Sequence, residues 1–250
     1  MSLSFNKNKG RPIAVIVGGK KDGKFIYLDP DWEKEGDDEY ICSAGEKVFP
    51  LPHFDKTEHI YVAGPTGCGK SYFVAEYVRQ LKKKQKKRKV ALISDVDEDP
   101  SIDKIKKLIR VDIKDPELLE KDSIDPQGFK DTVLIFDDID SIQNKQIANL
   151  IHTFKDAVLK RGRHEGITSI TTNHNTSDYR NTRVVLNESN AIVMYPRSGA
   201  TNGIKYVLEK YVGVSKDEVE NIMKLKTRFI YCYKHSPQYI VYEKGVYMLN

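Results

Sequence analysis

One stretch of the sequence, HIYVAGPTGCGKSYF at 59–73, restricts the fold more than any other. An apolar run typical of a buried strand enters a glycine-rich loop, and the chain then leaves the loop with the apolar spacing of a helix. The loop, residues 64–71, matches G-x-x-x-x-G-K-[ST], in which glycines let successive backbone N–H groups point at an anion. The sequence therefore predicts a phosphate-binding loop between a strand and a helix.

The loop also predicts what each of its residues binds. The candidate nucleotide-binding residues are Gly64, Pro65, Thr66, Gly67, Cys68, Gly69, Lys70, Ser71 and Tyr72. Lys70 is expected to reach the β- and γ-phosphates of ATP, and the Ser71 hydroxyl to bind Mg²⁺. The alternative, a chance match in an ordinary glycine turn, is disfavoured because a strand precedes the loop and a helix follows it. We therefore expect ATP and Mg²⁺ as cofactors.

A second acidic motif, VLIFDD at 133–138, supplies the remaining metal anchor that a phosphate loop needs. Its four apolar residues predict a buried strand, and Asp137 emerges at the strand end to hold Mg²⁺. Asp138 follows directly and suits a general base or a residue that orients water. The alternative is a strand that ends in an acidic turn and caps the next helix, and it stays open for both carboxylates.

From residue 59 onward, predicted strands alternate with predicted helices, which is typical of a parallel sheet wound with helices. The strands are expected at 59–63, 90–94, 132–137, 167–172 and 190–195, and the helices after the loop and at about 141–160. Hairpins are expected at 11–17 with 24–30 and at 228–234 with 238–249, with a linker at 48–54. The fold class is thus α/β with β-hairpin additions at both ends.

Three parts of the chain follow from this pattern. They are a β-rich extension at 1–57, an ATPase core at 58–200 and a helical and β-hairpin extension at 201–250 packed on the core.

Because a strand lies between the loop and VLIFDD, the two motifs are not on consecutive strands. This arrangement resembles the additional-strand class of phosphate-loop ATPases.

In that class, the strand after the Mg²⁺ aspartate inserts beside the phosphate-loop strand, and its tip carries a polar sensor for the γ-phosphate. Here the strand is GITSITTN at 166–173 and the tip is Asn173, unless Asn173 is only a polar strand end. Arg161 and Arg163 close the preceding helix. They could neutralise transition-state charge at a neighbouring subunit's nucleotide. Equally, they could be cations placed favourably at a helix C-terminus.

The order of four motifs resembles a known family more specifically. GPTGCGKS, VLIFDD, GRHEGITSITTNH and LNESNAIVMYPR are similar to the poxvirus-type genome-packaging ATPases of large DNA viruses, a branch of the FtsK–HerA superfamily. Many members carry Asp-Glu where this chain has Asp137-Asp138, a departure that weakens Asp138 as the catalytic carboxylate. The resemblance implies a ring, pentameric or hexameric, that hydrolyses ATP and threads double-stranded DNA into a preformed capsid. It also implies a capsid or portal-vertex protein as partner, in the host-cell cytoplasm where virus assembles or with the virion.

Composition sets wider limits. The 250 residues carry a formal net charge of +5, which is mildly basic and does not establish a polyanionic partner. The longest apolar runs are too short to cross a bilayer, and the three cysteines, without metal spacing, are expected to be free thiols.

Other functions remain open on the sequence alone. They are a different phosphate-loop ATPase such as a plasmid-mobilising ATPase or a helicase loader, a small-molecule kinase, and a non-catalytic nucleotide-binding scaffold. A basic run, KKKQKKRK at 82–89, is either a solvated loop or a contact for DNA phosphates or an acidic capsid surface.

Overall fold

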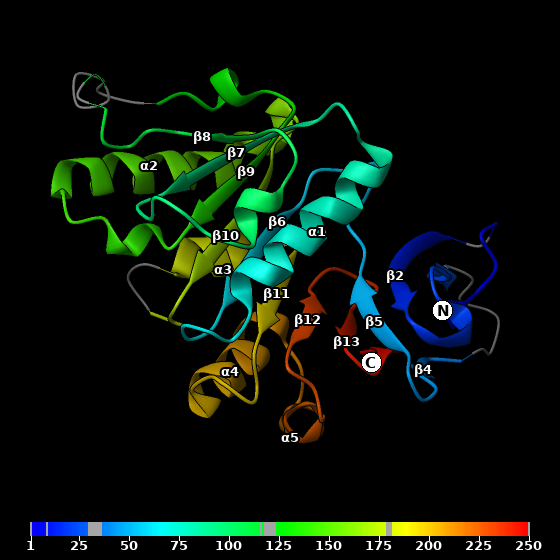
Figure 1. The fold of residues 1–250 in the computed structure, drawn as a ribbon. Coiled ribbons are helices and arrows are strands. Elements are labelled where there is room, and N and C mark those ends of the chain that lie inside the picture. Colours follow the sequence, from blue (N-terminus) through cyan, green and yellow to red (C-terminus); the bar gives the residue numbers. More distant parts are fainter. Residues whose placement is uncertain are drawn as a thin grey trace. The chain divides into compact units, whose positions relative to one another are not determined.

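The computed structural model describes residues 2–8, 10–29, 37–115, 117, 124–178 and 182–249 (Figure 1). The chain divides into two compact units, one of Met1–His53 with Ala191–Asn250 and one of Phe54–Asn190. The boundaries predicted at residues 57 and 200 stay a prediction. None of the described helices is both long and apolar enough to span a membrane.

The Phe54–Asn190 unit contains four of the five strands that the sequence predicts for the α/β core; the fifth, predicted at 190–195, is β11 (Ala191–Met194) of the other unit and pairs antiparallel with β12 (Ile230–Tyr233). Its strands and helices are β6 (His59–Ala63), α1 (Lys70–Lys84), β7 (Lys89–Ser94), β8 (Leu108–Arg110), β9 (Thr132–Asp137), α2 (Lys145–Arg161), β10 (Thr168–Asn173) and α3 (Arg183–Glu188). Short 3₁₀ turns are η2 (Ile102–Lys104), η4 (Pro126–Phe129), η5 (Ile139–Ser141) and η6 (Gly162–Glu165). The five strands pair in parallel in the order β6-β10-β9-β7-β8. The strand after the predicted Mg²⁺ aspartate, β10, thus lies between that strand and β6, as expected.

Helices α1 and α2 cover opposite faces of this sheet. The β6–α1–β7 crossover runs along the sheet in one direction and β9–α2–β10 in the other, so two right-handed crossovers place their helices on opposite faces. Ile151 and Phe154 of α2 pack with Leu134 and Phe136 of β9 in one buried cluster. The predicted apolar face of α1 is buried throughout, at Val74, Tyr77, Val78 and Leu81.

The other unit is built from antiparallel strands and short helices. Its strands are β1 (Ser2–Ser4), β2 (Arg11–Val17), β3 (Phe25–Asp29), β4 (Glu39–Ile41), β5 (Lys47–Pro50), β11 (Ala191–Met194), β12 (Ile230–Tyr233), β13 (Tyr239–Tyr242) and β14 (Gly245–Met248). Its helical segments are η1 (Gly19–Lys21), α4 (Thr201–Val207), the π-helical η7 (Leu208–Val212) and α5 (Lys216–Lys224). The strands form the orders β1-β3-β2-β5 and β11-β12-β13-β14-β4. Both predicted hairpins are present, β2 with β3 and β12 with β13, and β14 adds a further antiparallel strand beside β13.

Two expectations for the first 58 residues need correction. The stretch at 48–54, predicted as a linker, begins inside β5, which pairs with β2. Pro50, the last residue of β5, is compatible with a strand because β5 is at the edge of its sheet, and Pro52 lies beyond the strand. The acidic stretch at 29–40, predicted as a surface loop, contributes Asp29 to β3 and its last two residues to β4, while residues 30–36 lie outside the described residues.

Candidate nucleotide-binding site

The phosphate loop joins the carboxyl end of β6 to the first turn of α1. Gly67 and Gly69 have φ values of 78° and 108°, which residues with a Cβ rarely adopt, so glycine is required at both. The Gly64 N–H donates to the carbonyl of Asn173 at 3.0 Å, which fixes the loop to the end of β10. The N-terminal N–H groups of α1 therefore open toward the same edge of the sheet at which β9 and β10 end.

Lys70 lies buried at the centre of this edge. Its Nζ donates to the Gly64 carbonyl at 3.0 Å and to Nδ1 of His174 at 3.2 Å, and it lies 3.9 Å from Oδ1 of Asp138. His174 Nε2 is 3.1 Å from Oδ2 of Asp138. A neutral imidazole that carries its proton on Nε2 satisfies both contacts, because Nδ1 then accepts and Nε2 donates. Lys70, Asp138 and His174 thus form one connected polar group.

Asp137 and Asp138 share a partner on β10. Thr172 Oγ1 donates to Asp137 Oδ1 at 2.7 Å and accepts from the Asp138 N–H at 3.0 Å. Ser94 Oγ, at the end of β7, lies 3.5 Å from Asp137 Oδ2. Burial raises the pKa of Asp137, the Thr172 hydrogen bond lowers it, and the charge of Asp138 raises it further.

Asp138 has an unusual backbone conformation. Its φ of 45° and ψ of 39° are left-handed, which aspartate tolerates better than most residues with a Cβ but at a cost of about 1–3 kcal/mol. The η5 turn follows at once, with the Ser141 hydroxyl donating to the Asp138 carbonyl at 2.7 Å. The bend turns the chain away from β9 directly after Asp137 and leaves the Asp138 carboxylate beside His174 and Lys70.

Asn173, the predicted sensor, is bound to protein groups in this structure. Its Nδ2 donates to Asp140 Oδ2, and its Oδ1 accepts from the Asn175 N–H at 2.8 Å. The next residue, His174, is the one that contacts Lys70 and Asp138. The sequence indicated only the strand tip, and side-chain direction beyond the last strand residue depends on loop geometry that periodicity does not encode.

Asp99 is a further carboxylate that the sequence analysis did not single out. It follows β7, and the Ser71 hydroxyl hydrogen-bonds to its carboxylate. Burial raises the pKa of Asp99, but hydrogen bonds from the Ile102 N–H, the Ser71 hydroxyl and the Ser101 N–H outweigh it and lower the pKa. The only signal in the sequence was its place after a strand parallel to β9, since such strand ends meet at one edge.

The donor groups at this edge fit Mg²⁺. Ser71, Asp137 and Asp99 offer hydroxyl and carboxylate oxygens, the hard ligands that Mg²⁺ prefers. Within the described parts of the chain no three His, Cys, Asp or Glu side chains form a complete metal cage. Mg²⁺ in nucleotide sites is usually held by one or two protein groups together with water and substrate phosphates.

The sequence also predicted Arg161, Arg163, Cys68 and Tyr72 as residues of the site. Arg161 ends α2, and Arg163 lies in η6, which precedes β10; both are exposed. Because β10 runs parallel to β6, the start of β10, next to these arginines, is at the opposite end of the strands from the phosphate loop. Burial raises the pKa of the Cys68 thiol, so this loop residue is not activated as a nucleophile. Tyr72 is 60% exposed on α1.

Comparison with known proteins gives one close relative and several distant folds. No protein-family model matches the chain. It is 37% identical over 246 residues to protein V3 of Sputnik virophage, with 97% of each chain covered. The crystal structure of B204, the DNA-packaging ATPase from Sulfolobus turreted icosahedral virus, is 18% identical, with a TM-score of 0.51 over 77% of this chain and 97% of B204. The cytoplasmic domain of the type VII secretion ATPase EccC from Thermomonospora curvata is 12% identical, with a TM-score of 0.51 over 97% of this chain and 29% of EccC.

The sheet order and the phosphate loop define the class: the chain has the fold of the phosphate-loop NTPases, in the additional-strand arrangement. The chain shares this fold with B204 and EccC, so the fold that the sequence resemblance implies is confirmed. By its sequence, the chain belongs to the family of protein V3 of Sputnik virophage.

Proposed function

We propose that the chain is a Mg²⁺-dependent ATPase that moves double-stranded viral DNA into a preformed capsid. The observation that carries the hydrolytic part is the connected group of Lys70, His174 and Asp138 behind the phosphate loop. The DNA and the capsid are supported by the motif order and by a family member from a virophage. B204, described as a DNA-packaging ATPase, has the same fold.

Each residue of the group has a role that its position supports. Lys70 would leave its carbonyl and imidazole partners for the β- and γ-phosphates of ATP, because a phosphate oxygen is the stronger acceptor for an ammonium group. Asp138 would orient the attacking water and accept its proton as the bond to the leaving ADP oxygen breaks. His174 would hold Asp138 in place through Nε2. Mg²⁺, when bound at Ser71 and Asp137, supplies charge neutralisation on the β- and γ-phosphates.

The arginines and the ring belong to the same proposal. Since Arg161 and Arg163 lie at the sheet edge away from the loop of their own chain, they suit a nucleotide bound by a neighbouring subunit. We place them in a pentameric or hexameric ring that docks on a capsid or portal-vertex protein. In a hydrolysis assay, Arg163→Ala is then expected to slow turnover of the assembled ring without weakening nucleotide binding.

Steady-state hydrolysis tests the enzymatic core of the proposal. Wild-type protein should release one phosphate per ADP in the presence of Mg²⁺, and faster with duplex DNA. Lys70→Ala should lower turnover by about 100-fold or more, because it removes a charge aimed at the transferred phosphoryl group. Lys145→Ala, an exposed lysine at the start of α2, is the matched control and should keep wild-type turnover.

Two results would contradict the proposal. Wild-type turnover in Lys70→Ala would remove the phosphate loop from catalysis. ADP formation without phosphate release, in the presence of a nucleoside acceptor, would make the chain a kinase instead.

A further inference from the structure

A basic groove of about 810 Å³ runs beside α1 in the Phe54–Asn190 unit. One wall is a face of α1 from Tyr72 to Lys83, followed by Lys86 just beyond the helix end, and the other is residues 101–107, around η2. At 1.5 Å of rise per helical residue, the α1 part of the wall is about 17 Å long. The groove is therefore elongated along α1, and it begins one residue after Ser71 of the phosphate loop.

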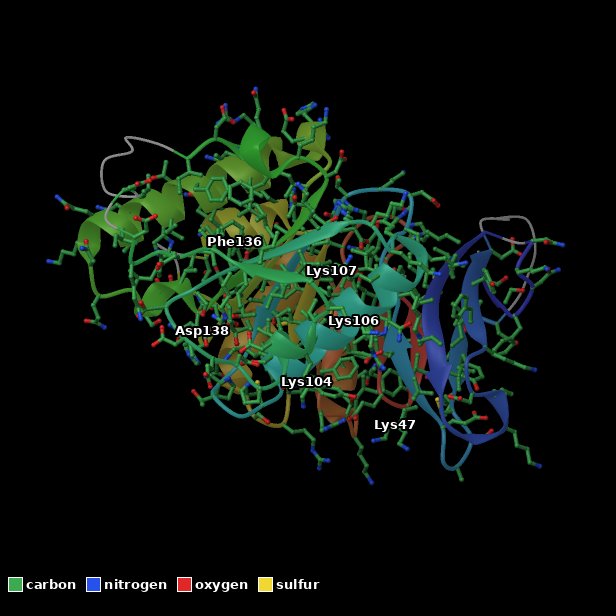
Figure 2. All side chains as sticks on the ribbon, turned by 45° about the horizontal axis from the view of Figure 1, so that its top comes forward. Lys47, Lys104, Lys106, Lys107, Phe136 and Asp138 are labelled. Carbon is green, nitrogen blue, oxygen red and sulfur yellow. The ribbon has the colours of Figure 1, made fainter. Side chains whose placement is uncertain are left out.

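Lysines dominate its lining. They are Lys82, Lys83 and Lys86 on one wall and Lys104, Lys106 and Lys107 on the other. Figure 2 labels the three from the second wall, which follow the length of α1 in that view. The only carboxylate among the lining residues is that of Glu76, which Arg79 of the same helix already pairs. Among the described residues, no carboxylate forms an ion pair with any of these six lysines, so the groove carries their full charge.

The fold holds these cations close together. Lys82 Nζ donates to the Lys106 carbonyl at 3.0 Å, which ties the two walls to each other. Burial, and next the charge of Lys107, lower the pKa of Lys82, so the like charges are near enough to repel. Lys107 itself has a left-handed φ of 60°, and Ile102 and Ile105 anchor its segment by burial. Such an arrangement is unfavourable for an empty protein and is relieved by a bound anion.

We propose that the basic groove binds a phosphodiester backbone of nucleic acid. Six lysines on the two walls of one groove present point charges to successive phosphates, a recognition that carries no sequence information. The exposed ring of Tyr72, at the end nearest the phosphate loop, offers a stacking face to an unpaired base. This inference rests on the proposed function only in taking DNA as the partner.

The groove also divides the basic run at 82–89. Lys82, Lys83 and Lys86 line it, whereas Lys87, Arg88 and Lys89 line a separate hollow. Arg88 donates to the Gly166 carbonyl and to Thr168 Oγ1, so it is a structural residue at the base of β10. Three of the seven basic residues of the run are therefore assigned to nucleic acid, and three lysines outside the run join them.

The test compares two triple variants of the full chain by fluorescence anisotropy. Lys104→Gln/Lys106→Gln/Lys107→Gln removes one wall of the groove. Lys20→Gln/Lys24→Gln/Lys226→Gln removes the same charge at exposed positions outside the groove. Probes are a random-sequence duplex, the matching single strand and polyglutamate, titrated between about 50 and 200 mM KCl. Basal ATP hydrolysis without DNA is measured on each variant and shows that the phosphate loop is intact.

For duplex DNA, the groove variant is expected to reduce the magnitude of the slope of log affinity against log salt by about 3. The control variant should reduce it by less than about 1. A preferential loss on the single strand, enhanced by Tyr72→Ala, would assign the groove to unpaired nucleic acid. Equal slopes for both variants, or groove-dependent binding of polyglutamate alone, would overturn the inference. If the wild-type protein does not hydrolyse ATP but its DNA binding still depends on the groove lysines, the proposed function is contradicted and the assignment of the groove stands.

Discussion

At the scale of single residues, Asp137 shows how a catalytic site opposes stability. Its carboxylate is only 5% exposed, accepts a hydrogen bond from Thr172, and lies near the charges of Asp138 and Asp99. Burial is the largest reason that its pKa is raised above the ordinary value of 3.8. A group with a raised pKa in the folded state stabilises the protein while it is protonated, and that stabilisation is lost as the pH rises through the folded pKa.

Asp137→Asn should therefore raise the unfolding temperature of the nucleotide-free protein at pH 7. Below pH 3.8 the two proteins should differ little, and the advantage of the variant should grow above it until the folded pKa is passed. The same variant should lose Mg²⁺-dependent hydrolysis, because an amide is a weaker ligand for a hard cation. Thermal unfolding of the wild type and Asp137→Asn across this pH series measures the difference in stability. Asp55→Asn, a substitution at an exposed position, is the control. A lower unfolding temperature for Asp137→Asn at pH 7 would show that its hydrogen bonds, and not burial, dominate.

How much of the site the sequence predicted depends on the residue. Lys70 and Ser71 are set by a loop whose chemistry requires their spacing, and Asp137 by the end of a wholly apolar strand; the structure places all three at one sheet edge. His174 and Asp99 escaped because each lies in a loop beyond a strand end. Their side-chain directions result from backbone turns and from partners distant in the sequence, such as Ser71 for Asp99.

At the scale of elements, α2 begins where a side chain satisfies its free N–H groups. Asn144 Oδ1 accepts from the N–H groups of Gln146 and Ile147, at 2.9 and 3.3 Å. The sequence predicted this helix from about residue 141, but η5 occupies 139–141 and the helix starts at Lys145. Local apolar spacing gave the helix and its buried face, whereas its first residue depends on the turn that Asp138 begins.

Asn144→Ala should lower the free energy of unfolding by about 1 kcal/mol, because two N–H groups lose their acceptor. Asn144→Asp keeps an oxygen acceptor and adds charge favourable to the helix N-terminus, so it should match wild type. Urea denaturation of the three proteins makes the comparison. Equal losses for both variants would mean that the asparagine side chain packs and does not cap.

Strand prediction from the sequence was wrong at the edge of one sheet and accurate in the buried parallel sheet. The prolines of 48–54 argued against a strand, yet β5 forms because an edge strand tolerates Pro50 at its end, and Pro52 lies outside it. Conversely, β6, β7 and β9 were predicted within a residue of their ends, since strands of a parallel sheet are apolar on both faces.

At the scale of the whole molecule, one α/β unit contains a phosphate loop, a carboxylate pair and a basic groove. Tyr72 and Ser71 are neighbours on α1, so a nucleic acid in the groove would lie beside the bound nucleotide. Repeated hydrolysis could then be coupled to movement along a backbone, which is the central claim of the proposed function.

The most direct test of that claim is displacement of a third strand from a duplex. The protein is incubated with duplex DNA that carries a labelled triplex-forming oligonucleotide, and release of the label reports movement along the duplex. Wild-type protein should release it only with ATP and Mg²⁺, and Lys70→Ala should not release it. A wild-type protein that hydrolyses ATP on DNA but leaves the third strand in place would contradict translocation.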